Sequence, residues 1–250
     1  MKRLTLALGA LAAMMSAAAV TAADIKVLAS NGVRGALEEL APAFERATGN
    51  KLAMTFGLAA VLKRQIEAGE AFDLAILTSA GIEDLARQGK IDAASRTSIA
   101  RSGVGIAVRS GAPKPDISTA EALKRALLSA KSITWAKEGA SGIYFASVVE
   151  KLGIAEQLKP KLNLGASGAQ VGEMIAKGEA EMGALLINEF LAVKGVDVVG
   201  PLPPELQSYT VFYSGVSAAS KNAAATKALI QFLITPAAGA VFKSKGQEPG

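Results

Sequence analysis

The sequence contains no cysteine and no histidine among its 250 residues. Their absence excludes disulfide bonds, Ser-His and Cys-His catalysis, and zinc sites built from histidine or cysteine. Hydrolase chemistry would then need a Ser-Lys pair or two paired carboxylates, and no such arrangement stands out. The acidic residues fall mostly on predicted helix faces, where solvation is their ordinary role. We therefore expect a protein that is not an enzyme and that holds no metal and no cofactor.

Long hydrophobic runs are also missing, with one exception at the N-terminus. There, two basic residues precede an apolar run over residues 4–20, and small residues follow it. This order of segments is typical of a secretory signal peptide, predicted here as residues 1–23. A membrane anchor is the alternative, but the run is short and alanine-rich for a spanning helix. We expect cleavage after Ala22 or Ala23 and a periplasmic mature protein without a lipid anchor, since no cysteine follows the cut.

Charge of one sign is not concentrated anywhere, and aromatic residues make up only 5% of the chain. A basic block with interleaved aromatics is therefore absent, and nucleic-acid binding is not supported. The small excess of 27 basic over 22 acidic residues is compatible with attracting anions. Removing the signal peptide leaves about 227 residues, which suits one large domain or two modest ones.

Short apolar segments alternate with amphipathic ones along the remaining chain. The predicted strands are residues 25–29, 52–56, 74–77, 104–108, 132–136, 182–186 and 209–216. The predicted helices are residues 33–47, 61–68, 82–88, 118–128, 142–152, 168–177, 223–233 and 237–243, the fourth opened by a capping box at 118–121. Alternation of this kind predicts an α/β protein with mostly parallel sheets flanked by helices. Similar strand-bend-helix units in both halves favour two lobes over one continuous sheet.

Four strand-to-helix junctions are built from small residues, at 29–32, 57–60, 139–142 and 167–170. Small residues let a ligand approach the backbone closely, and a helix start presents unpaired N–H groups and the positive end of the helix dipole. Together these features make anion sites that need no charged side chain. Plain helix capping explains any single junction as well. Four junctions facing one another across a cleft would enclose a small anion.

Several motifs then resemble one known family in the same order along the chain. The segment 62–74 reads LKRQIEAGEAFDL, residues 141–144 read SGIY and are followed by KLG at 151–153, and 235–243 contains TPAA and FK. These elements are similar to those of the periplasmic molybdate-binding proteins of ABC importers. The resemblance covers nearly all of the chain after the signal peptide. It implies the two-lobed type II periplasmic binding fold with a ligand cleft between the lobes.

The resemblance also implies how the chain is divided between the lobes. Lobe 1 would comprise residues 24–103 and 210–250, and lobe 2 residues 104–209. The two crossings between lobes would lie near Ser102–Gly105 and Gln207–Phe212. We expect a monomer that captures a small anion and docks on an ABC permease in the inner membrane.

The ligand hydroxyls of that family do not have counterparts here. The resemblance implies that members of that family hold a tetrahedral oxyanion with two lobe-1 serines and a lobe-2 tyrosine. The corresponding positions in this chain fall at Gly32, near Ala59 and at Leu186. Each missing charge-assisted hydrogen bond removes about 1.5–3 kcal/mol. An organic anion such as a carboxylate is therefore favoured, and molybdate or tungstate is the alternative.

Countercharge for the ligand could come from Arg34, Arg101 or Lys137, each near a strand end or a helix start and each equally plausible at the surface. Trp135 is expected in the core. The full set of candidate ligand-binding residues is Ser30, Asn31, Gly32, Leu58, Ala59, Arg101, Lys137, Ser141, Gly142, Ile143, Tyr144, Ser167, Gly168 and Asn188. Two other classes remain open, a periplasmic enzyme on the same fold and a sensory domain without a permease.

Overall fold

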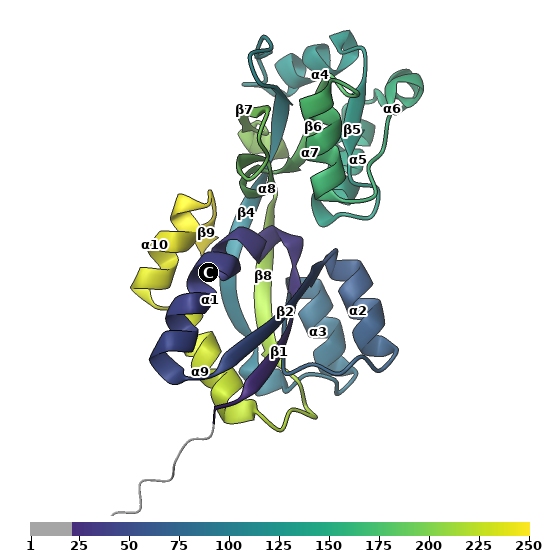
Figure 1. Cartoon of the computed structure of the whole chain (residues 1–250). Helices are drawn as coiled ribbons and strands as arrows, with labels where there is room; N and C mark the ends of the chain where they lie inside the picture. Colours follow the sequence, from purple (N-terminus) through teal and green to yellow (C-terminus); the bar gives the residue numbers. More distant parts are fainter. Residues whose placement is uncertain (1–21) are drawn as a thin grey trace, which may run out of the picture.

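The computed structural model describes residues 22–250, which form two lobes joined by extended strands (Figure 1). The predicted signal peptide, residues 1–23, lies outside the described residues except for its last two. Within residues 22–250 no single helix has the length and hydropathy needed to cross a membrane. Helices α9 (Ala223–Leu233) and α10 (Pro236–Ser244) satisfy that test only as a pair, and they are bent by 64° relative to each other.

Lobe 1 is built around a sheet with the strand order β2-β1-β3-β8-β4. Its strands are β1 (Asp24–Ser30), β2 (Lys51–Gly57), β3 (Leu74–Thr78), β8 (Tyr209–Val216) and the first half of β4 (Thr97–Arg109). Its longer helices are α1 (Arg34–Thr48), α2 (Ala59–Glu67), α3 (Ser79–Arg87), α9 and α10. A short β9 (Glu248–Pro249) pairs with β4 near the C-terminus.

The continuous apolar run of β3 follows from burial of both faces of this sheet. Leu74 and Ile76 pack into the core with α1, α9 and α10, whereas Ala75 and Leu77 pack with α2 and α3. Successive side chains of a strand point to opposite faces, so a strand covered on both sides has no polar face. The two helix groups lie on opposite sides of the sheet in Figure 1.

Lobe 2 repeats the arrangement on a smaller scale. Its strands are the second half of β4, β5 (Ile133–Trp135), β6 (Met182–Leu186) and β7 (Val196–Pro201). Its helices are α4 (Ala120–Ser129), α5 (Ala140–Lys151), α6 (Ala155–Leu158), α7 (Gly168–Lys177) and α8 (Ile187–Leu191). The short α8 lies where the two lobes meet (Figure 1).

Strand β4 belongs to both sheets. Residues 97–103 pair with β8, whereas residues 104–109 pair with β6 and β7. At the change of partner, the Gln207 side chain donates to the Val104 carbonyl at 3.0 Å and accepts from the Val104 N–H at 3.1 Å. The crossing is thus made by extended backbone, the kind of segment that can serve as a hinge.

The expected two-lobed α/β fold is confirmed, with two differences in detail. The sheets are mixed rather than mostly parallel, because β4 and β8 run antiparallel to their neighbours while β1–β2, β1–β3 and β5–β6 are parallel. The predicted capping box is also displaced, since Thr119 rather than Ser118 caps α4 through the Ala122 N–H at 3.1 Å. Strand β7, helices α6 and α8 and the first half of β4 were not predicted.

Candidate functional site

A small cavity, termed here the inner cavity, lies between the lobes at the ends of the strands. Its volume of about 30 Å³ is enough for about one or two water molecules in this closed arrangement. Lobe 1 and β8 contribute Ser30, Asn31, Leu58, Ala59, Thr78, Thr210 and Phe212. Lobe 2 contributes Ala136, Gly139, Ala140, Ser141, Gly168, Leu185, Leu186 and Glu189. All four small-residue junctions of the sequence therefore reach this one cavity.

Among the helices that start at the cavity, α2, α5 and the short α8 have no side-chain cap. The N-cap residues Leu58 of α2 and Gly139 of α5 make no side-chain hydrogen bond to the first turn. By contrast, Thr78 caps α3 and Ser167 caps α7 through their hydroxyls. The first N–H groups of a helix have no partner within the helix, so they are free to bind an anion when no side chain occupies them. The uncapped starts of α2 and α5 thus supply backbone donors from both lobes.

Glycine at position 32 is required by its neighbour on β8. A Cβ atom on Gly32 would overlap the ring of Phe212, which is fully buried. Ser30, two residues earlier, uses its hydroxyl to accept from the Gly32 N–H at 3.3 Å. A serine at position 32 would therefore not fit, and the nearby serine hydroxyl is already engaged with the backbone.

Within the described part of the chain, Glu189 is the one ionisable side chain that lines the inner cavity, and it is not among the candidates predicted from the sequence. It lies on α8, where a Cβ on Gly168 would overlap its carboxylate. Among residues 22–250 it makes no hydrogen bond or ion pair, although part of its side chain is accessible from the cavity. Burial raises the pKa of Glu189 from 4.5 to about 7. A carboxyl group with this pKa exists in both protonation states near neutral pH.

The inner cavity adjoins a wider opening of about 730 Å³, termed here the outer pocket. The two share Asn31, Gly168 and Glu189. Other residues of its lining include Arg34, Phe56, Asn188, Lys245 and Gln247. The guanidinium of Arg34 lies 4.7 Å from the centre of the Phe56 ring. This space is large enough for a small organic molecule, and its cations lie on the lobe-1 side.

The amides of Asn188 and Gln247 both donate to the Gly32 carbonyl, at 2.7 and 2.9 Å. Because Asn188 belongs to lobe 2 and Gly32 to lobe 1, the first of these bonds joins the lobes. A second link is the ion pair between Arg64 of α2 and Glu138, which precedes α5, at 3.2 Å. The described conformation is therefore closed by polar contacts on both sides of the inner cavity.

Several predicted site residues lie away from the inner cavity. Arg101 pairs with Glu248 and stacks on Tyr209, and Lys137 is exposed. The Tyr144 hydroxyl donates to the Leu206 carbonyl at 2.9 Å, and Ile143 is 59% exposed. A Cβ atom on Gly142 would overlap the Ala136 carbonyl, and the Ser167 hydroxyl caps α7. Trp135 is buried in the core, as expected. Of the three cations proposed from the sequence, only Arg34 reaches the outer pocket.

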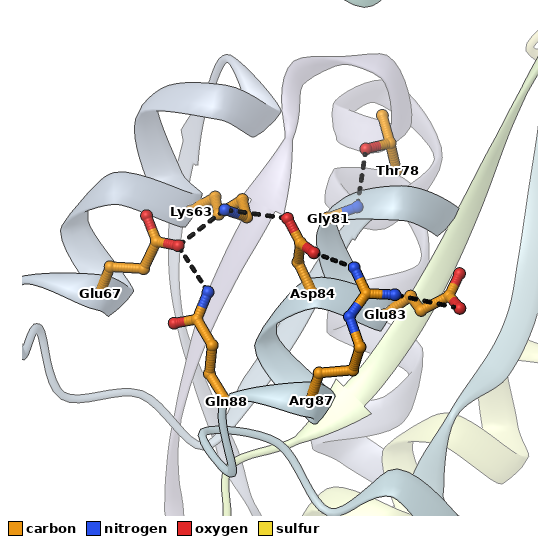
Figure 2. Close-up of polar contacts among 8 residues, drawn as sticks. All are labelled: Lys63, Glu67, Thr78, Gly81, Glu83, Asp84, Arg87 and Gln88. Carbon is orange, nitrogen blue, oxygen red and sulfur yellow. Dashed lines mark hydrogen bonds and ion pairs between the residues drawn. The ribbon is translucent and has the colours of Figure 1, made fainter.

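A polar cluster on the far side of α2 fixes that helix against α3 (Figure 2). The Lys63 ammonium lies 2.6 Å from Glu67 and 3.2 Å from Asp84. Gln88 donates to Glu67 at 2.8 Å, and Arg87 pairs with Asp84. The hydrogen bond to Glu67 raises the pKa of Lys63. The pKa of Glu67 is lowered chiefly by the hydrogen bond from Gln88, and the pKa of Asp84 is lowered chiefly by the hydrogen bond from Lys63. These contacts hold the uncapped start of α2 in place without entering the cavity.

Comparison with known proteins agrees with this fold. The model of the bacterial extracellular solute-binding protein family matches residues 25–248. A relative from Pseudomonas sp. named aconitate isomerase is 32% identical, over 98% of this chain and 96% of its own. The molybdate-binding protein ModA of Azotobacter vinelandii is 29% identical, over 98% and 97%. The solved structure of the Azotobacter vinelandii periplasmic molybdate-binding protein superposes with a TM-score of 0.77 at 19% identity, over 90% of this chain and 99% of that one.

The chain belongs to the bacterial extracellular solute-binding protein family. The resemblance to molybdate-binding proteins is thereby confirmed. The predicted class, a solute-binding component of an ABC importer, is confirmed at the level of the family. Its relatives include both binding proteins and one protein named as an isomerase.

Proposed function

We propose that the cleft binds a small organic anion carrying more than one carboxylate, and that molybdate is not the ligand. One observation carries this proposal: the three positions expected to hold hydroxyl ligands are Gly32, Ala59 and Leu186, and the buried Phe212 ring leaves no room for a serine at the first. A tetrahedral oxyanion would lose most of its donors at such a site. The relative named aconitate isomerase supports a tricarboxylate as the kind of ligand.

The distribution of charge fits an elongated anion better than a compact one. One carboxylate would be bound by the uncapped starts of α2 and α5 in the inner cavity. The remaining carboxylates would extend into the outer pocket toward Arg34 and Lys245. Opening of the lobes about β4 and β8 would admit the ligand, because the inner cavity as described is too small for it.

The protein would work in the periplasm after removal of its signal peptide. The family's description as extracellular and the leading segment of the sequence support this location. As a monomer it would present the closed, ligand-bound form to an ABC permease in the inner membrane.

The proposal is tested by thermal shift and isothermal titration of the mature protein with molybdate, tungstate, sulfate, acetate, citrate, cis-aconitate and trans-aconitate. Ligand binding to the folded state raises Tm by an amount that grows with the logarithm of the ligand concentration relative to Kd. We expect a tricarboxylate to raise Tm and molybdate to leave it unchanged. Tight molybdate binding, with no response to any carboxylate, would refute the proposal.

A pair of variants locates the site. Ala59→Asp places a negative charge at the uncapped start of α2, and we expect it to weaken tricarboxylate binding at least about 100-fold, since like charges cost several kcal/mol. Ala80→Asp makes the same change in the first turn of α3, where the residue is exposed. Acidic residues favour a helix start, so neither variant should unfold the protein. Equal affinities in the two variants would place the ligand elsewhere.

A second candidate function is isomerisation of the bound carboxylate. It is favoured by the carboxyl group of Glu189 inside the cleft, which has no polar partner among residues 22–250, and by the relative named as an isomerase. The sequence contains no histidine or cysteine for this chemistry, so Glu189, the ionisable residue of the inner cavity, is the candidate for moving the proton.

A further inference from the structure

We propose that Glu189 is a catalytic residue that takes a proton from a carbon of the bound ligand and returns it to another carbon, which shifts a double bond. The substrate class is an unsaturated di- or tricarboxylate. The inference rests on the proposed function, because it requires an organic carboxylate in the cleft.

The position of Glu189 is the first argument. Its carboxylate lines the inner cavity and the outer pocket, so it would face a ligand that occupies both. Gly168, at the start of α7, leaves the room that the carboxylate fills. A side chain serving only the fold would be expected to have a partner at such a buried place, since unpaired buried charge is costly. Among residues 22–250 no hydrogen bond or ion pair reaches the Glu189 carboxylate, and since it lines the cavity we assign the ligand as its partner.

The surroundings of Glu189 contain few charges that could fix its protonation. Facing it across the outer pocket are Arg34 and Glu38 of α1 and Lys245 after α10. Arg34 lies 3.9 Å from Glu38, and Lys245 pairs with Glu39 at 2.6 Å. Burial therefore governs this carboxyl group, and its pKa of about 7 suits a group that both accepts and returns a proton near neutral pH.

The proton shift balances without any other reactant. The ionised Glu189 carboxylate removes a proton from the saturated carbon that lies between a ligand carboxylate and the C=C bond. The C–H bond breaks, and its electron pair delocalises into the double bond and the carboxylate. The protonated Glu189, whose carboxyl proton can exchange with water, then gives a proton to the far carbon of the former double bond. One C–H bond is lost and one is formed, so the product is an isomer and nothing is oxidised or reduced.

The uncapped helix starts supply the complementary part of the site. Negative charge builds up on the ligand carboxylate while the proton is on Glu189. The free N–H groups at the starts of α2 and α5 would stabilise that charge where it develops. A carboxylate base and amide donors in one cleft would provide the proton transfer and the charge stabilisation that this reaction needs.

The experiment follows cis-aconitate and trans-aconitate by proton NMR in D₂O with the full mature protein. The wild-type protein should replace the CH₂ and vinyl protons with deuterium and interconvert the two compounds. Glu189→Gln keeps the size of the side chain and removes its acid–base function, and we expect it to lower both rates by at least about 100-fold. The exposed Glu179→Gln is the matched control and should keep the wild-type rates.

Binding is measured on the same samples by isothermal titration, so that the two proposals fail separately. If the wild-type protein binds aconitate but neither exchanges its protons nor interconverts the two compounds, Glu189 is not catalytic and the binding function stands. The same holds if Glu189→Gln exchanges at the wild-type rate. If citrate binds but no unsaturated polycarboxylate does, only the catalytic role falls, and if no polycarboxylate binds at all, both proposals fall. The wild-type rate should also rise with pH as Glu189 ionises around pH 7, and a flat profile would contradict the assignment.

Discussion

Gly168 has no side chain, and this leaves space for the Glu189 carboxylate. An added Cβ would overlap the end of the Glu189 side chain, while its next neighbour, the Leu185 Cδ1 atom, is 3.1 Å away. The carboxylate sits at the end of a flexible side chain, so it can swing aside at modest energetic cost. Gly168→Ala should therefore fold with a loss of about 1 kcal/mol and still displace the carboxylate from the cavity.

We expect Gly168→Ala to lose most of the proton exchange with aconitate while keeping a cooperative unfolding transition, as measured by NMR and circular dichroism. Gly35→Ala is the control for folding alone, because Gly35 lines the outer pocket and its Cβ would have only the Lys245 side chain nearby, at 4.0 Å. That variant should be neutral or slightly more stable. Wild-type exchange rates in Gly168→Ala would show that the close fit around Glu189 has no functional role.

The raised pKa of Glu189 also predicts how stability depends on pH. In the folded state Glu189 stays protonated up to about pH 7, whereas in the unfolded chain it loses its proton near pH 4.5. Between these values the folded state binds more protons, so stability falls as pH rises, by on the order of 3 kcal/mol in total. Carboxylates with lowered pKa, such as Glu67 and Asp84, act in the opposite sense and at lower pH.

Urea unfolding of wild type and Glu189→Gln from pH 4 to 9 isolates this contribution. Glutamine does not ionise, so the difference in unfolding free energy should favour the variant increasingly from pH 4.5 to about 7 and then stay constant. Parallel curves across that range would mean that Glu189 is ionised as easily in the folded protein as in the unfolded chain.

At the scale of helices and strands, the sequence predicted those elements whose local hydrophobic pattern is set by burial of a fixed face. The run at 74–77 and the helix spacing at 33–47 correspond to β3 and α1 because burial on fixed faces requires those periods. The first half of β4 was missed because its polar residues 97–103 gain strand structure by pairing with β8, more than 100 residues later. Helix α8 has only five residues, too few for a periodic signal.

The site residues differ in the same way: those with a local sequence signal could be predicted, and those that depend on distant contacts could not. The small-residue junctions were visible in the sequence, because close backbone approach needs small residues wherever the chain goes next. Glu189 was not, since nothing in its local sequence says that its carboxylate will be buried between two lobes. Arg101 was selected for standing near a strand end, yet its partner Glu248 is 147 positions away. A charged residue near a strand-to-helix junction is therefore weaker evidence for a ligand contact than the small residues of the junction itself.

The whole molecule must open for a ligand larger than about two water molecules to reach the inner cavity. The closed form is held by the bond from Asn188 to Gly32 and by the ion pair between Arg64 and Glu138. Both partners of the ion pair are more than half exposed, so the pair contributes little on its own. Its role is to bias closure, because its two residues come together only when the lobes do.

Glu138→Gln should shift the molecule toward the open form and lower ligand affinity by no more than about five-fold. Arg64→Gln should do the same, and the double variant should lose no more affinity than either single one, because each change removes the same pair. Small-angle scattering would register the shift as a larger radius of gyration without ligand, and saturating ligand should restore the wild-type value. Glu150→Gln, exposed on α5, serves as the charge-matched control. Additive losses in the double variant would mean that the two residues act on the ligand separately, and the ion pair would then have no part in closing the cleft.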